Sequence, residues 1–369
     1  MLRLCQPQIS PAAIAAVVEV LQSGQLVYGA QGQAFEAELA AYLGSPHAVL
    51  VSSGTAALHL ALMALDLGPG DAVLVPEFTF PATANVVQQL GARVVLVDVD
   101  PATYTLDLAA LERQLHSWAG PERLRAVMPV HEFGAPVAME ALLALAERHN
   151  LQVIEDAACA LGADHQGRRL GTWGQLGCFS FHPRKTLTTG EGGLICTADA
   201  ALAERLRALR SHGMMRSGGQ VRFVESGLNY RLTDLQAVLG RHQLPCLDGW
   251  IARRRELAVL YRRELASLEA HGLLRLPLDQ PGHSYQTFMV VLAPHVERPA
   301  VIEQLAARGI EANLGAQSLS TLGLYGPAPA MQAGPLLYRQ GLAIPLHESM
   351  QDDQVLQVCA ALQAALVLA

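Results

Sequence analysis

The sequence predicts an α/β protein with a large domain, in which a mostly parallel seven-stranded sheet lies between helices, and a smaller C-terminal α+β domain. Between residues 47 and 200, β-rich runs alternate with segments of helical periodicity. Such alternation is typical of a parallel sheet covered by helices on both faces. The chain has 369 residues, of which 51% are hydrophobic. At roughly 150 residues per domain, this length predicts about two domains with a large apolar core.

The predicted elements follow one another in pairs, since each of the first four β-rich runs precedes a helical pattern. The pairs are AVLVSS (48–53) with GTAALHLALMAL, DAVLVPEF (71–78) with PATANVVQQL, RVVLVDV (93–99) with LAALERQL, and RAVMPV (125–130) with VAMEALLALAERHN. QVIEDA (152–157) ends this series, and GCFSF and GGLIC are predicted to be two further strands. Ligands of such sheets lie beyond the carboxyl ends of the strands.

We place the domain boundary near residue 245, with a large domain over 1–245 and a small domain over 246–369. The first dozen residues are expected to fold back on either part. An Arg-rich helical segment, 248–265, opens the small domain, and its interleaved glutamates and helical apolar spacing predict a solvated face or a subunit interface. Net charge −7 argues against a nucleic-acid site there. The Gly-rich stretch 211–227 is expected to be a mobile loop.

Composition also excludes several classes of protein. The longest apolar runs are broken well before the roughly 18 residues of a membrane span, and the N-terminus has no secretory signal pattern. The six cysteines are scattered, which predicts buried thiols in a reducing compartment and no disulfide framework or metal site. A cytoplasmic protein with no membrane or nucleic-acid partner is therefore expected.

Lysine usage points to one residue. Lys185 is the only lysine among 26 basic residues. The pKa of arginine stays above ~12, so arginine can replace lysine as a surface charge but cannot form a Schiff base. Lys185 is therefore a candidate for chemistry that needs an amine. Because Arg184 precedes it, a P-loop is excluded, and neither G-x-S-x-G nor H-E-x-x-H occurs.

Three groups are predicted to share the carboxyl rim of the sheet. Lys185 follows the strand GCFSF, Asp156 ends the strand QVIED, and the turn 53–55 (Ser-Gly-Thr) opens a helix after AVLVSS. An amine for a Schiff base, a carboxylate for a pyridine nitrogen and a helix N-terminus for a phosphate are what pyridoxal 5′-phosphate requires. Ser180 can add a hydroxyl to the phosphate, and Phe80 can cover one face of the ring.

The chain resembles the DegT/DnrJ/EryC1/StrS family of pyridoxal-phosphate sugar aminotransferases, which have fold type I. The resemblance covers nearly the whole chain. The motifs that carry it are GQLVYGAQGQAFEAELAAYLG, VSSGTAALHLAL, VPEFTFPATANVV, VMPVHEFG, VIEDAACALGA, FSFHPRKTLTTGEGGLI, GLNYRLTDLQAVLG and LAIPLHESM.

The resemblance implies a role for each site residue. Lys185 would be the Schiff-base lysine and proton carrier, and Asp156 the partner of the pyridinium nitrogen. The implied cofactor-binding set is Gly54, Thr55, Phe80, Asp156, Cys159, Ser180, Lys185 and Asn229. Asn229 would reach the phosphate of the neighbouring subunit, which implies a homodimer with shared active sites. Arg231 would bind an anionic substrate group across that interface.

Two positions depart from the family pattern. Cys159 stands where Gln or His commonly contacts the 3′-oxygen of the cofactor, and a thiol is a weak donor. The segment 311–325 lacks the His of the substrate loop that many members carry. Contacts to the keto substrate are therefore not carried over.

The expected function is a ping-pong transamination from L-glutamate or L-glutamine to a keto group of a nucleotide-linked sugar. A keto-cyclitol is the alternative substrate. A pyridoxal-phosphate sugar dehydratase and a non-catalytic, cofactor-binding regulator are alternative functions, as are other fold-type-I reactions such as acyl transfer or desulfuration. The dehydratases replace the lysine by His, so Lys185 favours transamination, and the intact pair of Lys185 and Asp156 argues against a regulator.

Overall fold

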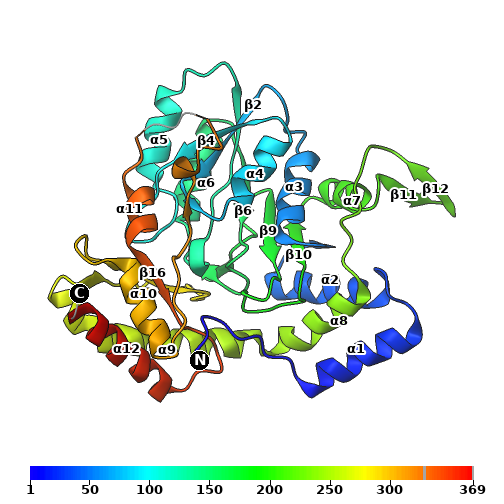
Figure 1. The fold of residues 1–369 in the computed structure, drawn as a ribbon. Helices are drawn as coiled ribbons and strands as arrows, with labels where there is room; N and C mark the ends of the chain where they lie inside the picture. Colours follow the sequence, from blue (N-terminus) through cyan, green and yellow to red (C-terminus); the bar gives the residue numbers. More distant parts are fainter. Residues whose placement is uncertain (327–329, 368–369) are drawn as a thin grey trace.

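A seven-stranded sheet forms the centre of the computed structural model, which describes residues 1–326 and 330–367 (Figure 1). Its strand order is β1-β10-β9-β6-β5-β2-β4. Strand β10 runs antiparallel to β1 and β9, and the other four pairings are parallel. The strands are β1 (His47–Val51), β2 (Asp71–Pro76), β4 (Arg93–Val97), β5 (Arg123–Val127), β6 (Gln152–Asp156), β9 (Leu176–Ser180) and β10 (Gly193–Thr197). The predicted mostly parallel sheet is confirmed.

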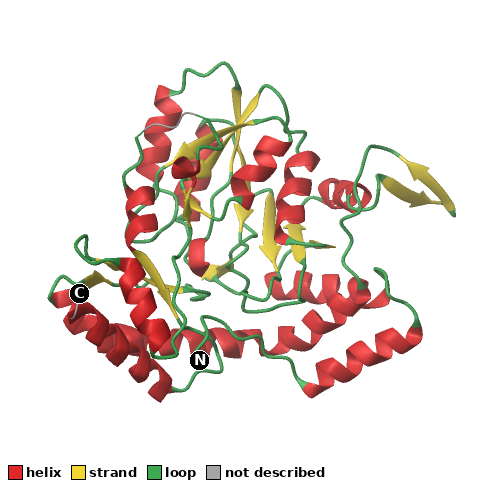
Figure 2. Ribbon diagram, viewed as in Figure 1, coloured by secondary structure: helices red, strands yellow, loops and turns green. Residues whose placement is uncertain are grey.

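Helices cover both faces of this sheet (Figure 2). Successive side chains of a strand point to opposite faces, so Val73 packs in one apolar cluster and Leu74 in the other. The first cluster includes α3 (Gly54–Ala64), α4 (Ala82–Gln89) and α7 (Ala200–Leu209). The second includes α2 (Ala30–Leu43), α5 (Leu108–Ser117), α6 (Met139–Arg148) and α8 (Asp234–Gln243). Burial on both faces explains why these strands are continuous aliphatic runs.

The C-terminal part has an apolar core of its own. Helix α9 (Leu247–Ala270) joins the two parts, because Leu247 and Ile251 pack in the large core while Leu257 packs in the C-terminal core. The remaining elements of this core are β13 (Leu274–Arg275), β14 (Phe288–Leu292), α10 (Arg298–Ala307), β16 (Gly341–Ile344) and α12 (Asp352–Val367). Leu2 bridges to Ile310. The boundary near residue 245 stays a prediction.

The described residues form further elements outside the central sheet. They are α1 (Pro11–Ser23), β3 (Phe78–Thr79), η1 (Glu132–Gly134), β7 (Asp164–His165), β8 (Arg168–Arg169), η2 (Leu244–Cys246), β15 (Gln317–Ser318), η3 (Leu319–Leu322) and α11 (Ala333–Gln340). Strand β3 pairs with β15 outside the central sheet. The run predicted as one strand over 71–78 therefore ends its sheet pairing at Pro76. Within the described residues, no helix has both the length and the apolar character needed to cross a membrane.

The Arg-rich helix, for which the sequence predicted a solvated face or a subunit interface, also carries a buried arginine. Arg254 is 1% exposed. Its guanidinium lies 2.9 Å from a carboxylate oxygen of Glu348 and donates to the carbonyls of Tyr285, Gln286 and Leu346. A buried arginine is stable only with such partners, and the partners lie far from it in the chain.

The Gly-rich stretch, predicted as a loop, contains two paired strands. It forms a hairpin of β11 (Met214–Ser217) and β12 (Gln220–Phe223), which projects from the body of the protein (Figure 1). Gly218 and Gly219 connect the strands with φ of 57° and 77°, the positive values that tight hairpin turns need. The cysteines are free as predicted, but they are not all buried, since Cys246 is exposed.

Candidate active site

The N-terminus of α3 touches the carboxyl end of β9. A Cβ atom built on Gly54, the first residue of α3, would lie 2.8 Å from the Ser180 Cβ and 3.2 Å from its Oγ. Real Cβ contacts are longer, so a glycine is what lets the helix start approach the strand so closely. The predicted neighbours Gly54 and Ser180 are therefore brought together.

This helix start has the properties of an anion site. The Ser53 side chain caps the helix by accepting a hydrogen bond of 3.0 Å from the Ala56 N–H. The first N–H groups of a helix have no partner inside it, and those of Gly54 and Thr55 belong to this turn. Thr55 is exposed, so the turn opens to the surface. The Ser180 hydroxyl adds a further donor beside it.

Asp156 ends β6 and is 4% exposed. Its Oδ2 accepts a hydrogen bond of 2.8 Å from the Thr83 hydroxyl, and its Oδ1 accepts one of 3.1 Å from the Ala158 N–H. Burial raises the pKa of this carboxyl, while the two hydrogen bonds and the charge of Lys185 oppose the rise. The carboxylate is thus held in one orientation.

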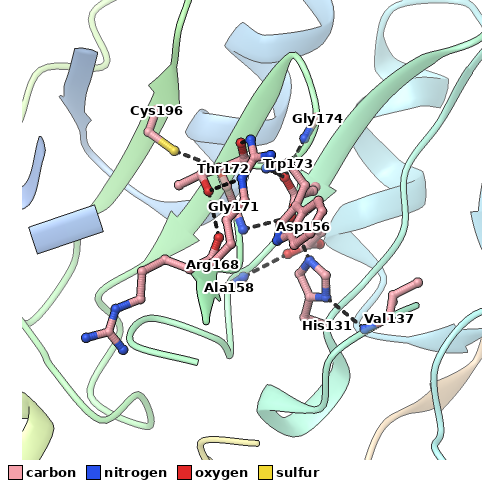
Figure 3. A network of polar contacts seen from close by, with 12 residues as sticks. His131, Val137, Asp156, Ala158, Arg168, Gly171, Thr172, Trp173, Gly174 and Cys196 are labelled. Atoms are coloured by element: carbon pink, nitrogen blue, oxygen red, sulfur yellow. Dashed lines mark hydrogen bonds and ion pairs between the residues drawn. The ribbon is translucent and has the colours of Figure 1, made fainter. Parts of the chain in front are cut away.

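A second buried acid, Glu155, precedes Asp156 on β6. Figure 3 shows His131, Gly171, Trp173 and Gly174 in the network of polar contacts at this strand. Glu155 points to the other side of β6 and accepts hydrogen bonds of 2.6–2.7 Å from the backbone N–H groups of Gly171, Trp173 and Gly174. Nε2 of His131 lies 2.9 Å from the same carboxylate. The Val137 N–H donates to Nδ1 of His131, so Nε2 carries the proton and donates to Glu155.

Lys185 lies on the connection between β9 and β10. This connection is fixed to the sheet by the Phe181 N–H, which donates to the Gly192 carbonyl. Nζ of Lys185 is 3.0 Å from Sγ of Cys159. Burial lowers the pKa of the amine, but a thiolate at Cys159 and the carboxylates of Glu132 and Asp156 raise it more, so the pKa lies above its ordinary value. The structure therefore groups the predicted amine, carboxylate and thiol.

The other predicted residues are not part of this buried group. Phe80 is 71% exposed, and Asn229 is also exposed. In the described ranges, neither Asn229 nor the half-buried Arg231 forms a side-chain hydrogen bond. Their segment nevertheless runs beside the α3 turn, because the Ser52 N–H donates to the carbonyl of Tyr230. The roles of these three residues stay predictions.

Sequence analysis did not assign roles to four buried side chains of this region: Thr83, His131, Glu132 and Glu155. Of these four, only the charged residues could have been noticed in the sequence. Charges at the ends of VMPVHE and VIED interrupt runs that are otherwise buried on both faces. Thr83 lies within a helical pattern that is compatible with ordinary packing.

Comparison with known proteins agrees with this geometry. The chain is 36% identical over 364 residues to a UDP-N-acetyl-3-dehydro-alpha-D-glucosamine 3-aminotransferase of Acidithiobacillus ferrooxidans, covering 94% of this chain and 92% of the relative. It is 38% identical over 338 residues to a GDP-perosamine synthase of Caulobacter vibrioides, and this alignment covers 90% of this chain and 89% of the relative. The aminotransferase TlmJ of Streptoalloteichus hindustanus superposes with a TM-score of 0.92 at 34% identity, and the superposition covers 100% of this chain and 99% of TlmJ.

These similarities confirm the predicted fold type I and the predicted activity class. Residues 7–363 match the family described as the DegT/DnrJ/EryC1/StrS aminotransferase family. Both the match and the similar proteins extend over nearly the whole chain. The chain belongs to the DegT/DnrJ/EryC1/StrS aminotransferase family.

Proposed function

We propose that this aminotransferase moves an amino group from L-glutamate or L-glutamine to a keto group of a nucleotide-linked sugar. The observation that carries the proposal is the position of Lys185, whose amine lies beside Cys159 and within the electrostatic reach of Asp156. The names of the Acidithiobacillus and Caulobacter relatives, which refer to UDP- and GDP-linked sugars, support the substrate class.

The residues present fit pyridoxal 5′-phosphate. When bound, this cofactor supplies an aldehyde that condenses with amines and a ring that accepts electrons. Lys185 provides the amine, and Asp156 would hold the ring nitrogen. The close approach of Gly54 and Ser180 makes the α3 turn a cradle that any Cβ at residue 54 would fill, and this cradle would hold the phosphate.

Each site residue would have a separate role in the reaction. Nζ of Lys185 would accept the proton from Cα of the amino-acid donor and would then donate a proton, because a positioned amine can act first as base and then as acid. The buried Asp156 carboxylate keeps its orientation through Thr83 and Ala158. Phe80, exposed at the end of β3, would cover the ring, and Cys159 would lie beside its 3′-oxygen.

The proposal includes a homodimer with shared active sites. Asn229 would serve the partner subunit's phosphate site, and Arg231 would bind an anionic group of the substrate. Asn229 is exposed, and its segment runs beside the start of α3. This position supports the role, because an exposed side-chain amide is accessible to a second subunit. We also propose a cytoplasmic location, since all six cysteines are free thiols.

The test is the near-visible absorbance of the purified protein with pyridoxal 5′-phosphate, recorded before and after excess L-glutamate or L-glutamine. The wild type should show the band of the lysine-linked cofactor, and the donor should shift it. Lys185→Arg, which keeps the positive charge, should show neither. Incubation of the amino form with UDP- and GDP-linked keto sugars should then yield an amino sugar by mass spectrometry. Full turnover by Lys185→Arg would refute the proposal.

A further inference from the structure

The stretch 182–187, which carries Lys185, has few hydrogen bonds to the rest of the protein. Within residues 1–326 and 330–367, two hydrogen bonds join it to distant parts of the chain, and its others are local. One of the two is the contact between Nζ of Lys185 and Sγ of Cys159. The other is accepted by the backbone carbonyl of Arg184, the residue that precedes the lysine. The donor to that carbonyl is therefore in a position to control where the amine lies.

This donor is Gln286, which lies just before β14 in the C-terminal part of the chain. It is 9% exposed, and its Nε2 lies 2.7 Å from the Arg184 carbonyl oxygen. The Thr287 hydroxyl donates to Oε1 of Gln286 at 3.0 Å, which orients the amide with its NH₂ group toward Arg184. A side chain of the C-terminal part thus holds the backbone next to Lys185.

The backbone of residue 286 makes separate contacts. Its N–H donates to the Phe133 carbonyl at 2.9 Å, and its carbonyl accepts a hydrogen bond of 3.2 Å from the Arg254 guanidinium. These contacts attach the segment to η1 and α9 without using the side-chain amide. A substitution of the Gln286 side chain can therefore remove the contact with Arg184 and leave the attachment of the segment intact.

The same segment also contacts the backbone of Cys159. Ser284 is 1% exposed, and its hydroxyl donates to the Cys159 carbonyl at 3.5 Å. Residues 284–286 therefore hydrogen-bond both to Cys159 and to the residue before Lys185. The side chains that extend from these two backbones meet, since Nζ of Lys185 lies 3.0 Å from Sγ of Cys159.

We propose that Gln286 is a positioning residue that holds the Lys185 amine beside the Cys159 thiol through the Arg184 carbonyl. Without this hydrogen bond, the backbone next to Lys185 would move more freely and Nζ would occupy a wider range of positions. The rate of a reaction at a positioned amine depends steeply on such placement. This catalytic consequence rests on the proposed function, but the placement of the amine does not.

The single lysine makes a direct test possible. o-Phthalaldehyde joins a primary amine and a thiol that lie side by side into a fluorescent isoindole, with release of two water molecules. Lys185 and Cys159 are both partly exposed, so the reagent can reach them in full-length protein without cofactor. The wild type should form the isoindole, and peptide mass spectrometry should locate it on these two residues.

Two variants remove the donor of Gln286. Gln286→Glu keeps the shape and an acceptor for the Thr287 hydroxyl, and Gln286→Met removes the donor without adding a charge. Both should form the isoindole about twofold to tenfold more slowly, the effect expected from the loss of one hydrogen bond between neutral groups. Agreement between them excludes an effect of charge, and either one decides the question if circular dichroism shows that the other does not fold.

The matched control is Gln88→Met. Nε2 of Gln88 donates to the Leu324 carbonyl at 3.0 Å, so this variant removes the same kind of hydrogen bond at an exposed position and should leave the rate unchanged. Lys185→Arg and Cys159→Ser should form no isoindole at this site and provide the blanks.

A second measurement uses the protein with cofactor and amino donor. In Gln286→Glu, kcat for the donor half-reaction should fall about tenfold while KM for the donor stays unchanged, because the placement of the amine affects the chemical step. A change in KM with unchanged kcat would contradict the proposal.

A wild-type isoindole rate in a folded Gln286 variant, or no isoindole in the wild type, would overturn the proposal. Neither outcome touches the proposed function, which depends on the absorbance band and its response to the amino donor. Conversely, a missing band together with slower isoindole formation in the Gln286 variants would refute the proposed function and leave the positioning of Lys185 by Gln286 standing.

Discussion

The four hydrogen bonds that the Glu155 carboxylate accepts predict that an isosteric substitution of Glu155 causes a large loss of stability. In Glu155→Gln one carboxylate oxygen becomes an NH₂ group. Two of the present donors face each oxygen: Trp173 and Gly174 face Oε1, and Gly171 and His131 face Oε2. Whichever way the amide turns, its NH₂ group meets two donors that lose their acceptor.

The size of this loss follows from burial. Glu155 and His131 are both completely buried, so water cannot replace the missing acceptor. Each unsatisfied buried donor costs about 1–3 kcal/mol, and two of them predict a decrease of about 2–6 kcal/mol in the free energy of unfolding. The decrease should be accompanied by weaker cofactor binding, because Asp156 is the next residue of the same strand.

Urea unfolding followed by circular dichroism measures the effect. Glu112→Gln is the control, because its partner Arg148 is 58% exposed and such surface pairs contribute about 0–1 kcal/mol. The reasoning would be refuted if Glu155→Gln unfolded within about 0.5 kcal/mol of that control. A loss of similar size in Glu155→Ala would be compatible with the network, since the same donors lose their acceptor there.

Three further predictions concern other parts of the molecule. Gly54→Ala places a Cβ 2.8 Å from that of Ser180, so phosphate or cofactor affinity should fall at least tenfold by fluorescence titration, with the helix retained. Burial raises the pKa of Glu132 from 4.5 to about 7, so the unfolded chain loses this proton first and stability should fall by about 3 kcal/mol from pH 4.5 to 7. Glu132→Gln should remove that fall, as pH-dependent urea midpoints would show. A maleimide should label exposed Cys246 in the native protein, whereas buried Cys178 should react only after unfolding, by peptide mass spectrometry; equal rates would contradict the described packing.

The central sheet and its mostly parallel pairing could be predicted from the amino-acid sequence alone, and the sequence also indicated the chemistry of the sheet's rim. Strands buried on both faces must be aliphatic runs, and their regular alternation with helices leaves few possible topologies. A single lysine, a strand-end aspartate and a Ser-Gly-Thr turn then indicated a pyridoxal-phosphate site because parallel strands bring their carboxyl ends to one edge. These signals are local in sequence or follow from periodicity.

The partners of the buried charges, by contrast, could not be predicted from the sequence and are visible only in the folded chain. Arg254 has the sequence context of a surface arginine, and Glu348 and the carbonyls that bury it lie more than 30 residues away. The backbone N–H of His131 likewise donates to the carbonyl of Asp156, which fastens the turn that carries Glu132 to the end of β6. Pairing energies and pKa shifts depend on distances across the fold, and hydrophobic periodicity carries no information about those distances.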